Sequence, residues 1–130
     1  MDLDALAQTM PFAVASGVTL LSASKDECVA RLAWDEARTT LGGALHGGAL
    51  MTLADSVGAV CAFLNLPEGA ATSTLSSATN LLRGVRDGYA EAVSRPLHVG
   101  RTTIVVVTET RDAAGRLVAS TTQTQAVLTG

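Results

Sequence analysis

Aromatic residues, cysteines and runs of basic residues are all scarce in this sequence. Aromatic side chains make up 3% of the 130 residues while 48% are hydrophobic, so aliphatic side chains and alanine must form the core. The net charge of −3 and the lack of any basic run argue against nucleic acid as the main partner. No internal repeat, low-complexity tract or linker is present, and the length suits one domain over residues 1–130.

Several kinds of site are also missing. Cys28 and Cys61 lack the close spacing of a disulfide or metal pair, and His46 and His98 lie far apart, so we expect two reduced core cysteines, no metal and no cofactor. A G-x-S-x-G motif for a nucleophilic serine is absent. The first ten residues do not resemble a signal peptide, and with reduced cysteines this predicts a cytoplasmic protein.

Residues 46–66 form an almost uncharged stretch with a single acidic residue, Asp55, near its middle. The stretch is too continuously apolar for a helix with one wet face, so we expect a helix that is buried nearly all round. A membrane-spanning helix is the competing interpretation, which the central Asp55 and the absence of basic flanks disfavour. Because a buried carboxylate is costly, Asp55 must pair internally, become neutral or take part in a reaction.

Gly47 and Gly48 mark the expected start of this helix. The first N–H groups of a helix lack internal partners and lie at the positive end of its dipole, where they can hold an anion or a developing oxyanion. Asp55 follows Gly47 by a distance of roughly 12 Å along the helix, at about 1.5 Å per residue. An Asp side chain cannot easily span that distance, so a site that uses both residues needs a second chain packed antiparallel. The sequence therefore predicts an obligate dimer with shared sites.

Strand patterns lie on both sides of this helix. Alternating apolar residues predict two strands before it and four after it, and the N terminus predicts a short helix that ends near Pro11 and covers a pocket or an edge. The expected strands are 18–22, 28–34, 72–82, 90–97, 102–111 and 117–128, and the expected N-terminal helix is 2–10. This order indicates an α+β fold in which a curved antiparallel β-sheet wraps around one long buried central helix.

The central stretch resembles the helix of the hotdog-fold acyl-CoA thioesterases, in the branch of the phenylacetate-pathway (PaaI-like) thioesterases. That family carries a G-x-L-H-G-G turn, which residues 43–48 match, followed by L-A-D or L-A-E, which residues 53–55 match. The step from His46 to Asp55 agrees with the family spacing. The resemblance implies the hotdog fold, a thioester hydrolase acting on acyl-CoA, and a homotetramer built as a dimer of dimers.

The resemblance also implies roles for individual residues in the turn and the helix. Asp55 would act as general base or as nucleophile, and the two roles stay open, while the Gly47 N–H would bind the oxyanion. His46 and Gly48 would line or orient the substrate site. Thr40 stands where relatives often carry Asn or Gln, so its predicted part in substrate binding rests on a shorter side chain without an amide.

Three further residues are candidates outside the helix. Ser73 falls where some relatives place a hydroxyl near the acid, although serines often bond to local backbone instead. Arg83 and Arg101 could bind the phosphates of CoA, or could simply face water. We therefore expect hydrolysis of aryl or short- to medium-chain acyl-CoA. The alternatives are a non-catalytic acyl-CoA-binding hotdog protein, or a purely structural protein, which would leave Asp55 without a reason.

Overall fold

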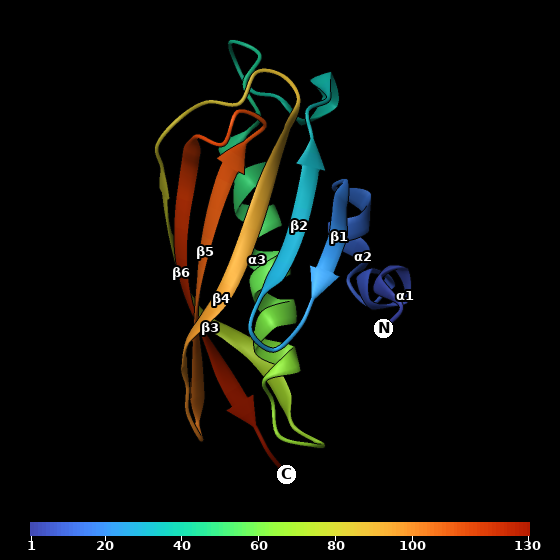
Figure 1. Cartoon of the computed structure of the whole chain (residues 1–130), viewed down its shortest axis with the longest axis vertical. Helices are drawn as coiled ribbons and strands as arrows, with labels where there is room; N and C mark the ends of the chain where they lie inside the picture. The colour runs from blue at the N-terminus through green and yellow to red at the C-terminus, as the bar shows by residue number, and fades with distance from the viewer.

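An antiparallel sheet curves around one long helix, α3 (Gly47–Leu64), in the computed structural model, which describes all of residues 1–130 (Figure 1). The strand order β1-β2-β4-β5-β6-β3 makes β4, β5 and β6 a meander and leaves β1 and β3 at the two edges. The strands are β1 (Val18–Ala23), β2 (Cys28–Ala33), β3 (Ala71–Leu81), β4 (Tyr89–Val99), β5 (Thr103–Asp112) and β6 (Leu117–Leu128). The predicted hotdog arrangement is confirmed.

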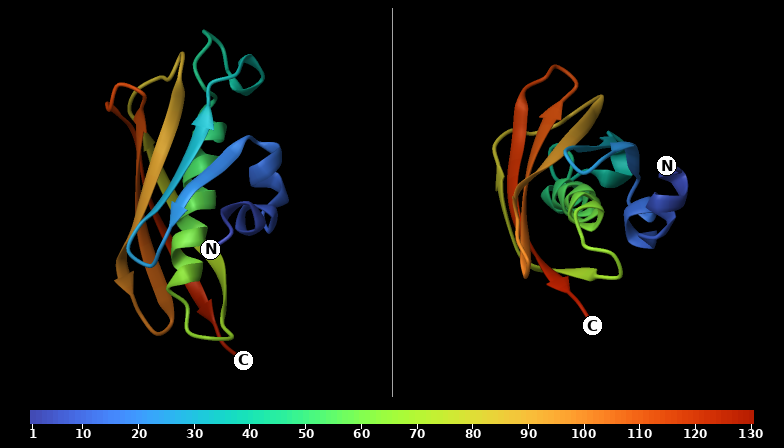
Figure 2. Two further views of the ribbon diagram at one scale, coloured as in Figure 1. Left: turned by 45° about the vertical axis from the view of Figure 1, so that its right-hand side comes forward. Right: turned by 60° about the horizontal axis from the view of Figure 1, so that its bottom comes forward.

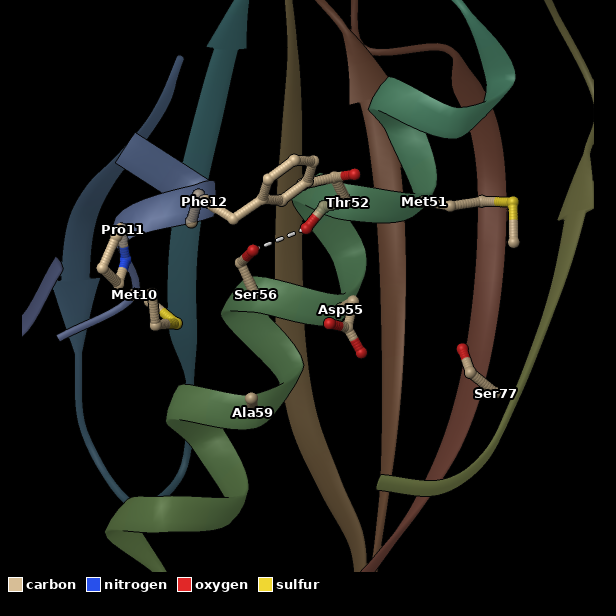
Figure 3. A pocket seen from close by; sticks show the side chains of 10 residues that line it. Met10, Pro11, Phe12, Met51, Thr52, Asp55, Ser56, Ala59 and Ser77 are labelled. Carbon is tan, nitrogen blue, oxygen red and sulfur yellow. Dashed lines mark hydrogen bonds between the residues drawn. The ribbon is translucent and has the colours of Figure 1, made fainter. Parts of the chain in front are cut away.

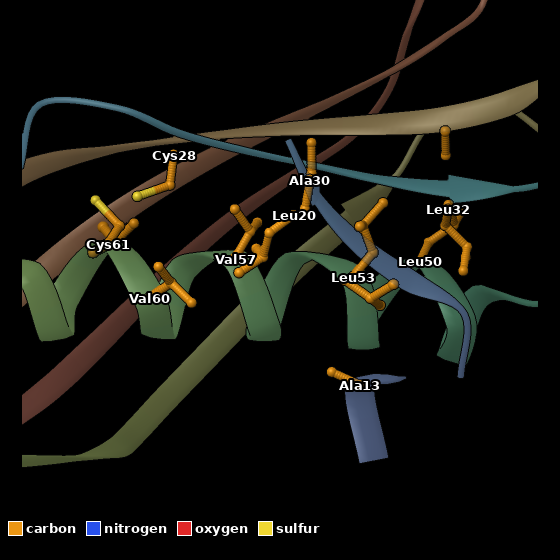
Figure 4. Packing of buried hydrophobic residues seen from close by; sticks show 14 of the residues in the cluster. Ala13, Leu20, Cys28, Ala30, Leu32, Leu50, Leu53, Val57, Val60 and Cys61 are labelled. Atoms are coloured by element: carbon orange, nitrogen blue, oxygen red, sulfur yellow. The ribbon is translucent and has the colours of Figure 1, made fainter. Parts of the chain in front are cut away.

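The helix α3 packs one face against the sheet and leaves another face open. Leu53, Val57 and Cys61 are fully buried and lie between α3 and the strands (Figure 4). Half of its 18 residues are buried, so the prediction of a helix buried nearly all round is wrong within one chain. The open face contains Asp55 and Phe63, because no element of the same chain covers it. By length and composition α3 could also cross a membrane, but here it is the core helix of the sheet.

The N-terminal segment lies on the side of α3 away from the sheet (Figure 2). It contains two short helices, α1 (Leu3–Gln8) and α2 (Pro11–Ala15), where the sequence predicted one. The predicted helix was expected to end near Pro11, and α1 ends shortly before it, at Gln8. Pro11 then begins α2, since proline fits the first position of a helix. The predicted loop before α3 contains one short 3₁₀ turn, η1 (Glu36–Arg38).

The side of the sheet that faces α3 changes from apolar to polar between β2 and β6. In β2 the inward residues Cys28, Ala30 and Leu32 are fully buried, as the alternation predicts. In β6 the buried Val118 and Ala119 are followed by three buried polar residues on one side of the strand, Thr121, Gln123 and Gln125. The edge strand β3 is exposed along nearly its whole length and has no charged residue.

Cys28 and Cys61 are free and buried, as expected, but the fold places their side chains together (Figure 4). A hydrogen bond from the Cys61 thiol lowers the pKa of Cys28 to about 7. The same bond raises the pKa of Cys61, because a second deprotonation would put two thiolates side by side. The pair joins β2 to the last turns of α3, a contact that the wide sequence spacing concealed.

Candidate active site

Asp55 lies in a groove of about 520 Å³ on the open face of α3. Figure 3 shows residues 10–12 of the N-terminal segment on one side of the carboxylate and Met51 and Ser77 on the other. Five of the ten residues that line the groove are hydrophobic, so an apolar group can lie beside the carboxylate. Ala59 also lines a second, mostly apolar cavity of about 250 Å³, which continues the groove toward Phe63.

The start of α3 leaves one N–H group without an acceptor. His46 caps the helix: its Nδ1 accepts the Gly48 N–H at 2.8 Å, which places the proton of a neutral ring on Nε2. The next amides, of Ala49 and Leu50, donate to the carbonyl oxygen of His46. The Gly47 N–H makes no hydrogen bond within the chain. One N–H group therefore remains free at the positive end of the helix dipole, at the predicted oxyanion position.

Thr40 lies outside the grooves around α3. It is exposed in the turn before the helix, where its N–H donates to the Ala44 carbonyl and its carbonyl accepts from Gly43. The neighbouring Thr39 instead lines a depression of about 620 Å³ together with His46 and Gly48. Of the predicted substrate-binding residues, His46 and Gly48 therefore lie together at this depression, and Thr40 does not line it.

Ser73 and Ser77 lie on opposite faces of β3 because of a bulge at Leu75. Ser73 pairs with Ala126 and Ser77 with Gln123, and the register shifts between these pairs. Opposed residues share a face, and Ala126 and Gln123 lie on different faces of β6. Ser77 therefore faces the groove, and the structure does not bring Ser73 to the acid of the same chain. The sequence prediction selected Ser73 and not Ser77, because nothing in the sequence indicates the bulge that separates the two serines onto different faces.

Gln123 is a second residue that the sequence did not single out. Its side chain is fully buried on β6, and its Nε2 donates to Asp55 Oδ1 at 3.3 Å. The sequence does show a polar residue at an inward position of this strand. It does not show which residue of α3 that position faces, so the contact with Asp55 could not be predicted. Asp55 therefore has one polar side-chain partner within the chain.

The two candidate arginines of one chain lie near opposite ends of its sheet. Arg83 follows β3 and lines a depression of about 320 Å³ with Gly47 and Leu81. Arg101 lies in the β4–β5 turn, at the end of the sheet far from the start of α3 (Figure 1). Both side chains are exposed. Only Arg83 is thus positioned near the helix start of its own chain.

Solved structures with the same architecture define the class of protein. The thioesterase of Haemophilus influenzae superposes with a TM-score of 0.92 at 27% identity, over 98% of this chain and 91% of the other. The PaaI protein of Escherichia coli superposes with a TM-score of 0.87, covering 98% of this chain and 91% of the other, but at 22% identity it shows the fold alone. The predicted placement in the PaaI branch is therefore not confirmed.

A family model described as the thioesterase superfamily matches residues 42–119. The ComA2 protein of Bacillus subtilis is 32% identical over 88% of this chain and 91% of its own length. The 1,4-dihydroxy-2-naphthoyl-CoA hydrolase of Escherichia coli is 37% identical over 66% of this chain, and the match spans 63% of that enzyme. An esterase-named protein of Vibrio cholerae is 39% identical over 65% of this chain and 57% of its own length. The chain belongs to the thioesterase superfamily.

Proposed function

We propose that this protein hydrolyses the thioester of aryl or short- to medium-chain acyl-CoA to the free acid and CoA. The observation that carries the proposal is that one helix, α3, presents two reactive groups. These are a free N–H at Gly47 and a carboxylate at Asp55 that faces a groove with apolar lining residues. Membership of the thioesterase superfamily supports thioester hydrolysis, and similarity to the 1,4-dihydroxy-2-naphthoyl-CoA hydrolase of Escherichia coli supports an aromatic acyl-CoA as one substrate.

The Gly47 N–H would bind the carbonyl oxygen of the thioester and stabilise the negative charge that forms on it. As general base, Asp55 would take a proton from a water molecule while the water oxygen attacks the carbonyl carbon. The carbon–sulfur bond then breaks, and the proton passes from Asp55 to the sulfur of the departing CoA. As nucleophile, Asp55 would instead attack the carbon itself, release CoA and leave a mixed anhydride for water to hydrolyse.

The two groups would come from different chains of a dimer. Since α3 is continuous from Gly47 to Leu64, the roughly 12 Å between Gly47 and Asp55 holds in the folded chain. The open face of α3 and the unpaired edge of β3 are the surfaces that a second copy would cover. The edge has neither charge nor proline to prevent pairing, and exposed Leu75 and Leu81 add apolar area to it. A dimer of dimers and a cytoplasmic location remain predictions.

The acyl group would occupy the groove beside Asp55 and extend toward Phe63, because both cavities along α3 have apolar lining residues and share Met10 and Ala59. CoA would extend past the start of α3 in the chain that supplies Gly47. There Arg83 could meet a phosphate. Arg101 lies far from this position in the same chain, so only the Arg101 of the second chain could contact the same CoA.

A free-thiol release assay on acetyl-, hexanoyl- and benzoyl-CoA tests the proposal directly. We expect turnover by the wild type and loss of turnover in Asp55→Asn, with Asp26→Asn as the control because Asp26 is exposed between β1 and β2 and does not line the groove. A folded wild type that binds these esters tightly but releases no thiol would contradict hydrolysis. That result would favour the non-catalytic binding protein, for which the exposed Thr40 is the first residue to study.

A further inference from the structure

We propose that Gln123 is a positioning residue that holds the Asp55 carboxylate in its reactive orientation, an inference that rests on the proposed hydrolysis. Gln123 is fully buried beneath the exposed Asp55, and its Nε2 lies 3.3 Å from Asp55 Oδ1. A carboxylate only accepts hydrogen bonds, so the amide must present its nitrogen to Asp55. With Oδ1 held by this bond, Oδ2 stays available to the groove.

The other end of the amide has no partner. Gln123 Oε1 is buried and accepts no hydrogen bond. This destabilises the folded state, because the oxygen accepts hydrogen bonds from water in the unfolded chain and none after folding. Gln125, the next inward residue of β6, is almost as deeply buried, but both ends of its amide are paired. Its Nε2 donates to Thr74 Oγ1 at 2.9 Å, and its Oε1 lies 3.2 Å from Thr72 Oγ1, a hydroxyl that also donates to the Ala126 carbonyl at 2.8 Å. Of these two inward glutamines, therefore, only the one that touches Asp55 has an amide oxygen without a hydrogen-bond partner.

Gly58 provides the space that this amide occupies. A Cβ built on Gly58 would lie 1.7 Å from Gln123 Oε1 and 2.7 Å from its Cδ, so any other residue would displace the amide. Glycine is itself unfavourable within a helix. Gly58 follows Asp55 by three residues, a spacing that puts both on neighbouring positions of one helix surface. Two unfavourable features, the unpaired Oε1 and a glycine within a helix, thus occur at one side-chain amide. The only hydrogen bond of this amide goes to Asp55.

The bond restricts the carboxylate without covering it. An exposed Asp side chain on a helix can otherwise rotate about two bonds, and only some orientations point an oxygen at a substrate or a water molecule. Misplacement of a reacting group by about 1 Å can cost about 100-fold in rate. We therefore expect Gln123 to affect kcat far more than KM, since it touches neither the acyl group nor CoA.

Gln123→Met tests the inference, because methionine has a similar volume but no donor. We expect kcat on the best substrate of the panel to fall about 10- to 100-fold with KM changed less than about twofold. The denaturation midpoint should stay the same or rise, because the unpaired Oε1 is removed. The matched variant Gln125→Met should do the opposite: kcat stays near the wild-type value while the midpoint falls, because Thr74 loses its partner.

Gly58→Ala provides a second test that keeps Gln123 but displaces its amide, and it decides the question if Gln123→Met does not fold. We expect a similar loss of kcat. Unchanged kcat in a folded Gln123→Met or Gly58→Ala protein would overturn the positioning role, even where Asp55→Asn is inactive and the proposed hydrolysis stands. If Asp55→Asn retains full turnover, the proposed mechanism fails first, and a loss in Gln123→Met would then have to be structural.

Discussion

Gly47 supplies a backbone N–H that side-chain mutations cannot remove, but proline can. Gly47 is the first residue of α3, where proline is well tolerated, and His46 before it has the extended backbone (φ −59°, ψ 136°) that a following proline favours. Gly47→Pro should therefore keep the fold while removing the free N–H. We expect kcat for thioester hydrolysis to fall about 100- to 1,000-fold, the usual effect of losing one oxyanion donor.

Gly47→Ala is the matched control, because it adds a similar Cβ but retains the N–H. The new Cβ would meet Leu81 Cδ1 at 2.8 Å, and this atom is the far end of an exposed, flexible side chain that can move away. We therefore expect a much smaller loss than for Gly47→Pro. Equal losses in the two variants would show that shape at this position matters, and that the N–H does not.

At the residue scale, the sequence was informative where the site is local in the chain. The relative positions of Asp55, Gly47 and His46 were predicted correctly because these residues lie on one helix and the turn before it, where spacing alone fixes them. Gln123 and Ser77 were missed because they reach the groove through strand pairing. A bulge decides which face Ser77 takes, and nothing in the composition of β3 indicates that bulge.

At the scale of the elements, helix and strand positions followed from the sequence, while the extent of burial of α3 did not. The strand β6 was predicted at its observed bounds, and the other strands within a few residues. The open face of α3 was not foreseen, because its small apolar residues look the same whether the sheet or a second chain covers them. The start of α2 was missed although Pro11 marks it.

The groove between the N-terminal helices and α3 should determine acyl length. Ala59 lines both of its cavities, so Ala59→Leu would narrow the passage toward Phe63. We expect kcat/KM to fall about tenfold or more for hexanoyl-CoA and much less for acetyl-CoA, since overpacking affects only the longer chain. Ala114→Leu, in the exposed β5–β6 turn, is the control. Equal losses on both esters in Ala59→Leu would place the acyl chain elsewhere.

At the scale of the whole molecule, the unpaired edge of β3 predicts a dimer. Leu75 is 63% exposed at the bulge of this strand, so Leu75→Lys would bring two like charges together in a pair of β3 strands. We expect size-exclusion chromatography with light scattering to show dissociation at concentrations at least about tenfold higher than for the wild type. Leu41→Lys, at a loop position that is 98% exposed, should leave the assembly unchanged.

An assembly that is insensitive to Leu75→Lys would show that β3 does not form the interface. The open face of α3 would then need another partner surface. Activity measured on the same samples adds a second test, because a shared site should lose turnover as the dimer dissociates.

The central claim, a hydrolytic site shared between two chains, is tested most directly by mixing two inactive variants. In Asp55→Asn the Gly47 N–H is intact, and in Gly47→Pro the Asp55 carboxylate is intact. Random pairing after mixing equal amounts makes half of the dimers mixed, each with one complete site, so thiol release should recover to about a quarter of the wild-type rate. A mixture that exchanges chains but stays inactive would contradict the shared site.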